Sequence, residues 1–173
     1  VVIWATSTMR TRGDDVAEVL YLMGLRPIWH PGTGKVLDLE VIPTSELKFP
    51  RIDVTIRSSG LFRDTFPNLM ALIDRGVRMI AALDEPETSN FLARNVRVDM
   101  RELMLSGLAP DEAQRRASFR LFSDKPGCYG AGVDVLLEVG KWNSPEDLGR
   151  AYVDWGGYAY GEDAYGVSEA SGF

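Results

Sequence analysis

Two polar segments of the chain combine arginines with hydroxyl side chains. They read ATSTMRTRGDD, from residue 5, and IRSSGLFRD, from residue 56. Guanidinium groups, hydroxyls and the free backbone amides at the start of a helix donate hydrogen bonds to carboxylates and phosphates. In a chain with a net charge of −6, four arginines in two short segments indicate a local anion-binding site. The residues concerned are Thr6, Ser7, Thr8, Arg10, Arg12, Arg57, Ser58, Ser59 and Arg63.

The same side chains also have a purely structural interpretation. The arginines can pair with Asp14, Asp15, Asp53 or Asp64, and the hydroxyls can cap helices. Neither segment matches the G-x-G-x-x-G dinucleotide fingerprint or the G-x-x-x-x-G-K-[ST] phosphate loop. The spacing therefore leaves both interpretations open.

A glycine-rich stretch, FSDKPGCYGAGVD, runs from residue 122 to residue 134. We expect it to follow a helix over residues 109–122, which argues against a phosphate loop, since such loops follow strands. A structural corner is the simpler interpretation, because glycine permits positive φ and close backbone approach. Cys128 would need a nearby base to act as a nucleophile, and the only histidine, His30, is distant in sequence.

The composition excludes several classes of function. A net charge of −6 and a pI of about 4.9 argue against general nucleic-acid binding. No apolar run approaches the length of about 20 residues that spans a membrane, so no membrane association is expected. One cysteine and one histidine argue against an internal disulfide and against a His/Cys zinc site. A cytoplasmic protein without a resident metal is the expectation.

The first half of the chain predicts an α/β fold. Short apolar runs predict strands at 1–5, 26–30 and 52–57, with an extended or hairpin segment at 35–43. Apolar residues at three- and four-residue spacing predict helices at 14–24, capped by Asp14 or Asp15, and at 66–80. This order indicates a small parallel Rossmann- or flavodoxin-like sheet with flanking helices. Ligands of such sheets bind beyond the carboxyl ends of the strands, where both polar segments are expected as loops.

The second half is predicted to be mostly helical and loop-rich. Helices are expected at 89–107, 109–122 and 144–155, the last capped by Ser144 with Pro145 and Asp147 in its first turn. Residues 133–139 fit a strand or a helix, and the glycine- and tyrosine-rich tail after 155 is expected to be irregular. We interpret residues 1–173 as a single α/β domain, excised from the later part of a longer chain.

Four longer segments together resemble one protein family. They read WATSTMRTRGDDVAEVLYLMGLRPIW, PRIDVTIRSSGLFRDTFPNLMALIDRGVRMIAALDEPE, EAQRRASFRLFSDKPGCYGAGV and DLGRAYVDWGGYAYG. In order and spacing they resemble the large subunit of the CobN and magnesium-chelatase family over nearly the whole chain. T-M-R-T with G-D-D, K-P-G-x-Y-G-A-G and W-G-G-Y-A-Y-G look more like the cobalt branch.

The resemblance implies part of the tetrapyrrole-binding large subunit of an ATP-dependent cobaltochelatase. Such an enzyme inserts Co²⁺ into hydrogenobyrinic acid a,c-diamide in aerobic cobalamin biosynthesis, and AAA+ partner subunits bind and hydrolyse the ATP. The fragment alone is expected to be inactive. Because the corrinoid carries several carboxylates, we predict these substrate-binding residues: Thr8, Arg10, Arg57, Ser58, Arg63 and Tyr129. Tyr129 belongs to the K-P-G-C-Y-G-A-G loop, which the resemblance places as a wall of the tetrapyrrole cleft.

Two alternatives remain open from the sequence. One is the large subunit of a magnesium chelatase acting on protoporphyrin IX, and the other is a non-enzymatic flavodoxin-like binding module. The catalytic residue that accepts the pyrrole protons is unknown. Relatives often carry a histidine after the arginine of N-F-x-x-R, whereas this chain has Asn95 there. For the K-P-G-C-Y-G-A-G loop, a purely architectural role is the alternative to a wall beside the substrate.

Overall fold

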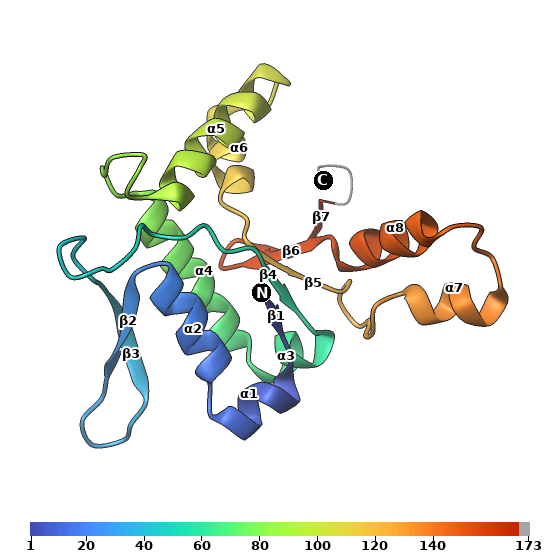
Figure 1. Cartoon of the computed structure of the whole chain (residues 1–173), viewed down its shortest axis with the longest axis horizontal. Coiled ribbons are helices and arrows are strands. Elements are labelled where there is room, and N and C mark those ends of the chain that lie inside the picture. The colour runs from blue at the N-terminus through green and yellow to red at the C-terminus, as the bar shows by residue number, and fades with distance from the viewer. Residues whose placement is uncertain (170–173) are drawn as a thin grey trace.

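The computed structural model describes residues 1–169, and its centre is a five-stranded sheet (Figure 1). Three parallel strands, β1 (Val2–Ile3), β4 (Ile56–Ser58) and β5 (Leu121–Ser123), lie side by side in this order. Two antiparallel strands, β6 (Tyr158–Gly161) and β7 (Ala164–Ser168), continue the sheet beyond β5. The predicted α/β class with a small parallel sheet is confirmed.

Helices surround this sheet. Within the described residues they are α1 (Ala5–Thr11), α2 (Asp14–Leu22), α3 (Gly60–Thr65), α4 (Pro67–Ala81), α5 (Phe91–Leu105), α6 (Pro110–Ala117), α7 (Val133–Val139) and α8 (Pro145–Gly156). The predicted helix over 66–80 is confirmed as α4, with Pro67 at its start. Its residues Ile73, Val77 and Ile80 are buried in the main core with Ile3 and Ile56 of the sheet.

One strand predicted for the parallel sheet lies outside it. β2 (Leu25–Trp29) pairs antiparallel with β3 (Val36–Val41) in a separate two-stranded ribbon. The six residues between these strands close a hairpin, whereas a parallel crossover needs about a dozen residues or more. The extended or hairpin segment predicted at 35–43 is therefore correct, but the strand at 26–30 does not join the sheet.

The first polar segment is helical, which corrects the loop predicted there. The hydroxyls of Thr8 and Thr11 each lie 3.1 Å from the carbonyl oxygen four residues earlier, on Trp4 and Ser7. Threonine hydroxyls within a helix commonly bond to the carbonyl four residues earlier, so these residues fit the helix although their helix propensity is low. Gly13 caps α2, rather than either of the aspartates predicted for that role.

The glycine-rich stretch follows a strand, which corrects the helix predicted over 109–122. Helix α6 ends at Ala117, and β5 comes directly before Asp124. Arg120 contributes to this ending, because its Nη1 donates to the carbonyls of Ala117 and Phe119 at 2.9 and 2.8 Å. The objection that the stretch follows a helix therefore no longer argues against a phosphate loop. The stretch still lacks the phosphate-loop motif.

The tail predicted to be irregular forms the β6–β7 hairpin up to residue 168. Tyr160 is buried and contacts the exposed Tyr165 edge-to-face, with ring centroids 5.4 Å apart. Such cross-strand aromatic pairs stabilise hairpins. Residues 170–173 of the predicted tail lie outside the described residues.

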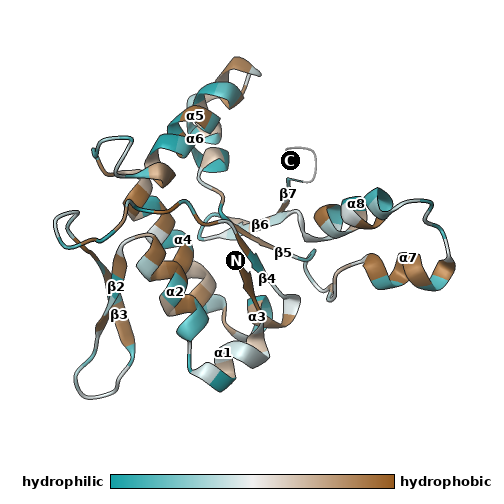
Figure 2. Ribbon diagram, viewed as in Figure 1, coloured by the Kyte–Doolittle hydropathy of each residue, from teal (hydrophilic) through white to brown (hydrophobic). Residues whose placement is uncertain are grey.

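Helices α7 and α8 form an arm that extends from the body of the molecule (Figure 1). Residues 133–139, predicted as strand or helix, form α7. As predicted, Ser144 caps α8, and the Asp147 carboxylate accepts from the Ser144 amide at 3.2 Å. Figure 2 shows α7 as largely apolar, although none of its residues is buried. The single domain over 1–173 stays a prediction.

Candidate functional site

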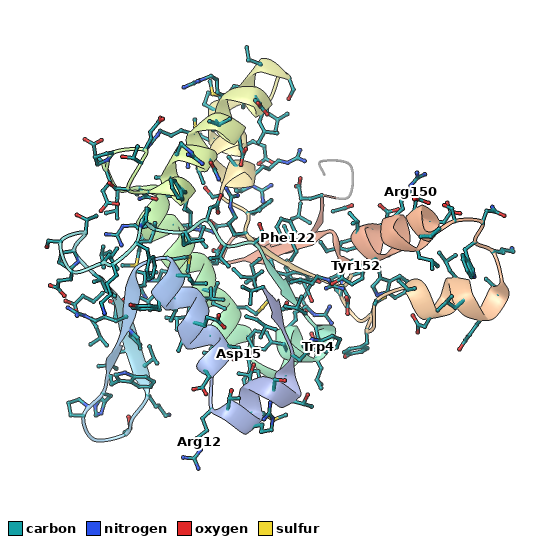
Figure 3. The ribbon with its side chains drawn as sticks, in the orientation of Figure 1. Trp4, Arg12, Asp15, Phe122, Arg150 and Tyr152 are labelled. Atoms are coloured by element: carbon teal, nitrogen blue, oxygen red, sulfur yellow. The ribbon has the colours of Figure 1, made fainter. Side chains whose placement is uncertain are left out.

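The carboxyl ends of the three parallel strands meet at one edge of the sheet. Trp4, Ser59 and Asp124 come directly after β1, β4 and β5. Trp4 is 54% exposed, and Figure 3 shows its position below the sheet near α3. Asp124, in contrast, is fully buried. The sequence predicts a ligand at this edge. The hydrogen bonds made here show which polar groups already have internal partners and which are free to bind a ligand.

Asp124 is the central acceptor of this edge. Its carboxylate accepts from Arg57 Nη2 at 2.5 Å and from the Gly60 amide at 3.1 Å. Arg57 also donates to the Ser58 carbonyl at 2.8 Å, and its guanidinium lies 5.6 Å from the ring centre of Tyr152 on α8 (Figure 3). Arg57 therefore joins the sheet edge to the α7–α8 arm.

Arg63 holds the glycine-rich loop in place. Its side chain is nearly buried, and its Nη1 donates to the carbonyls of Asp124 and Lys125 at 2.8 and 3.1 Å. Nη2 reaches the Cys128 carbonyl at 3.4 Å, while Nε and Nη2 form a bidentate pair with Asp64 at 2.6 and 2.8 Å. The bond to Asp64 is the main cause that raises the pKa of Arg63. All five N–H donors thus have internal acceptors.

Two tyrosines complete the support of this loop. Tyr129 is largely exposed and donates to Asp64 at 2.8 Å. The hydrogen bond that Asp64 accepts from Arg63 is the main cause of the lowered pKa of Asp64. Tyr160 is buried and donates to the Asp124 carbonyl at 2.6 Å, and its burial raises its pKa to about 12. The loop is therefore fixed from inside by hydrogen bonds, whatever lies beside it.

The six predicted substrate-binding residues fall into two groups. Arg57, Ser58, Arg63 and Tyr129 gather around Asp124, whereas Thr8 and Arg10 lie on α1. Among the first four, the Ser58 hydroxyl is fully buried and donates to the Phe122 carbonyl at 3.2 Å. The Arg63–Asp64 pair agrees with the structural interpretation of the arginines. The substrate-binding role of these residues stays a prediction.

The α1 residues differ in their freedom. Thr8 is buried, and its single hydroxyl proton can be donated to the Asp15 carboxylate at 2.5 Å or to the Trp4 carbonyl at 3.1 Å. Arg10 is exposed, and its guanidinium has no hydrogen bond or ion pair to any residue within 1–169. Of the six predicted residues, Arg10 is thus the one whose guanidinium is wholly available to a ligand.

A groove of about 690 Å³ opens beside α1. It lies between α1 and α2, the β2–β3 ribbon and the start of α4, and it includes Thr8, Arg12, Trp29 and Lys35. Trp29 and Lys35 were missed by the sequence-based site, because only the hairpin brings them next to α1. Arg12 was part of the first polar segment, so its charge was a usable signal.

The amino edge of the sheet carries a different polar network. Arg120 forms a bidentate pair with Asp53 at 2.6 and 3.1 Å, and Asn95 donates to Asp53 at 2.8 Å. Asn95 is therefore at the opposite edge from the glycine-rich loop. In the part of the chain that the structure describes, no three His, Cys, Asp or Glu side chains are grouped to bind a metal ion. Among residues 1–169, no helix combines the length and the hydropathy that a membrane span requires.

Comparison with known proteins places the chain in a family. The family model described as CobN/Magnesium Chelatase matches residues 1–173. The chain belongs to this family. Among solved structures of the CobN/magnesium-chelatase family, the catalytic subunit of cobaltochelatase from Mycobacterium tuberculosis superposes with a TM-score of 0.88 at 43% identity. That match covers 98% of this chain and 14% of the other.

Two members of the CobN/magnesium-chelatase family show that the chain is more similar to the cobalt-branch relative than to the magnesium-branch relative. The aerobic cobaltochelatase subunit CobN of Pseudomonas aeruginosa is 50% identical over 159 residues, covering 92% of this chain and 13% of that protein. The chloroplastic magnesium-chelatase subunit ChlH of Oryza sativa subsp. japonica is 37% identical over 167 residues, covering 96% and 12%. The chain thus spans about one eighth of the length of these relatives.

Proposed function

We propose that this chain is part of the tetrapyrrole-binding large subunit of an ATP-dependent cobaltochelatase. The enzyme would insert Co²⁺ into hydrogenobyrinic acid a,c-diamide during aerobic cobalamin biosynthesis in the cytoplasm. The observation that carries the proposal is the identity of 50% with CobN, compared with 37% with ChlH, over nearly the whole chain. The alternative with the strongest relatives is magnesium insertion into protoporphyrin IX.

The charges of the chain support a carboxylated substrate. Arg10, Arg12 and Lys35 are exposed cations without an ion pair among residues 1–169. Guanidinium and ammonium groups that lack internal partners bind carboxylates directly. A corrinoid bearing several carboxylates is therefore a suitable ligand, whereas Arg57 and Arg63 near Asp124 support the fold beside it.

The metal enters this reaction as a substrate. Insertion of a divalent cation displaces the inner N–H proton or protons of the macrocycle, so a base must accept them. Asn95 cannot take that role, since a carboxamide is not basic near neutral pH. In the proposed enzyme, ATP is hydrolysed by AAA+ partner subunits, and this chain contributes to the tetrapyrrole-binding subunit only.

Titration of the intact protein with the two tetrapyrroles tests the proposal. Hydrogenobyrinic acid a,c-diamide and protoporphyrin IX are added separately, and binding is followed by absorbance and by quenching of tryptophan fluorescence. Tight binding of the corrinoid alone is expected. Preference for protoporphyrin IX would replace the cobalt assignment by magnesium chelatase, and binding of neither would leave a flavodoxin-like module with another ligand.

A further inference from the structure

The groove beside α1 has the dimensions and walls of a small-molecule site. Its volume of about 690 Å³ falls within the range of about 300–1,000 Å³ that is usual for ligand pockets. Its apolar walls come from α1, α2, the ribbon and α4. The apolar lining residues are Met9, Val16, Ala17, Leu20, Pro27, Trp29, Val36, Phe66, Leu69 and Leu72.

The charged residues that line the groove all have one sign. Arg12 and Lys35 are its charged lining residues, and no Asp or Glu lines it, although the chain has 25 acidic residues. Both cations are exposed and form no ion pair within the described part of the chain. An apolar groove with two unpaired cations is complementary to an apolar body that carries carboxylates.

The backbone holds Arg12 in an unusual conformation at the junction of α1 and α2. Its φ of 62° makes it the one non-glycine residue with a positive φ among residues 1–169. The next residue, Gly13, closes the turn by donating its amide to the Thr8 carbonyl at 3.0 Å. Left-handed backbone is sterically unfavourable for residues with a Cβ, and such exceptions concentrate at functional sites. Figure 3 shows Arg12 at this turn, clear of the protein interior.

On the opposite wall, the β2–β3 ribbon presents an aromatic face. Its pairing register shifts between Ile28 and Trp29, and irregularities of this kind re-aim side chains. Trp29 is 57% exposed and lines the groove. The turn that follows brings Lys35 back beside it, because the His30 amide donates to the Lys35 carbonyl at 2.8 Å. One short hairpin thus supplies both a flat apolar surface and a cation.

We propose that this groove binds a carboxylated edge of the tetrapyrrole, with Arg12 and Lys35 pairing with its carboxylates and Trp29 packing against its apolar face. The proposal rests on the function proposed above and adds a location for part of the substrate. It also assigns the contact to residues that lie away from the Asp124 cluster, where the arginines already have internal partners.

The test compares Arg12→Gln, Lys35→Gln and the double variant in the intact protein. Arg101→Gln and Lys141→Gln are matched controls, since both residues are exposed, lack ion pairs within 1–169 and lie outside the groove. Each groove substitution is expected to weaken hydrogenobyrinic acid a,c-diamide binding about ten-fold, as for loss of one charged hydrogen bond. The controls are expected to keep the wild-type Kd and all variants the wild-type melting temperature.

The methyl ester of the same tetrapyrrole provides a second probe. It lacks the carboxylate charges, so wild type and the double variant are expected to bind it with equal Kd. Equal binding of the acid by wild type and the double variant would overturn the groove assignment and leave the proposed function standing. Equal weakening of acid and ester would also overturn it, whereas a wild-type protein that binds no tetrapyrrole would overturn the proposed function itself.

Discussion

The guanidinium of Arg57 lies directly against the backbone of Gly156. A Cβ at position 156 would come within 2.4 Å of Arg57 Nε and 2.6 Å of its Cζ. Gly156 ends α8, while Arg57 belongs to the central strand β4 and pairs with the buried Asp124. Gly156, the first glycine of the W-G-G-Y-A-Y-G run, therefore sets how closely the α7–α8 arm approaches the sheet.

Gly156→Ala is expected to loosen this contact. The new methyl group must displace Arg57 or shift α8, which destabilises the arm by about 1–3 kcal/mol. Hydrogen exchange of peptides covering 145–160 measures this local opening. Gly149→Ala is the control, because Gly149 lies in the same helix with nothing within 4 Å of a Cβ. That control should stabilise α8 by about 0.5–1 kcal/mol. Equal protection in the two variants would contradict the contact.

Arg63→Lys is expected to release the glycine-rich loop. Lysine has three donors in place of five and no planar fork, so at least two of the acceptors on Asp64, Asp124, Lys125 and Cys128 lose their bond. The loop is expected to lose about 2–4 kcal/mol of stability. Faster hydrogen exchange of the backbone amides in 124–130 measures this loss.

The matched control for that substitution is Arg75→Lys. Arg75 pairs with Asp38 on the surface, where both side chains are more than 40% exposed. Such pairs contribute about 0–1 kcal/mol, so its exchange pattern should stay that of wild type. If Arg63→Lys leaves the hydrogen-exchange pattern as unchanged as this control does, Arg63 does not hold the loop.

Glu85 is expected to make stability depend on acid pH. Its carboxylate pairs with the fully buried Arg51 at 2.7 and 2.9 Å, and this bond lowers the pKa of Glu85 below the ordinary value of 4.5. The stabilisation is thus fully present above pH 4.5 and is lost as the pH falls through the lowered pKa. Glu85→Gln should cost about 3 kcal/mol at pH 7, because Arg51 stays buried without its counter-charge.

Urea unfolding between pH 3 and pH 8 checks this expectation. The free energy of unfolding of Glu85→Gln should vary less below pH 5 than that of wild type, so the two curves converge in acid. Glu40→Gln serves as the comparison, since Glu40 pairs with Arg26 in an exposed position. A constant difference between Glu85→Gln and wild type at every pH would show that the effect is not electrostatic.

Tyr160 is expected to ionise at a higher pH than an ordinary tyrosine. Burial raises its pKa to about 12, and its hydroxyl donates to the Asp124 carbonyl. In a difference titration at the phenolate absorbance, Tyr160→Phe should remove a transition near pH 12. Loss of a transition near pH 10 instead, the ordinary value for an unperturbed tyrosine, would mean that Tyr160 is open to solvent.

Local patterns in the sequence predicted several elements correctly. The apolar spacing of α4 and the Ser144–Asp147 capping pattern of α8 depend on neighbours within a few residues, so both were readable from the chain. Helix α1 was missed because its hydroxyls turn back onto their own helix, and β6 and β7 were missed because glycines obscure their alternation. Those strands form where the edge of β5 offers free backbone partners.

The α/β class, the main helices, the family and the two arginine-rich segments could all be predicted from the sequence. Which arginines remain available to a ligand depends instead on tertiary contacts. Arg57 and Arg63 meet acceptors on Asp124, which lies 67 and 61 residues away, whereas Arg12 faces a groove completed by Lys35 from a separate ribbon. Pairing of buried charges depends on which distant groups the fold brings within hydrogen-bond reach, and residue type and local spacing carry no record of that distance.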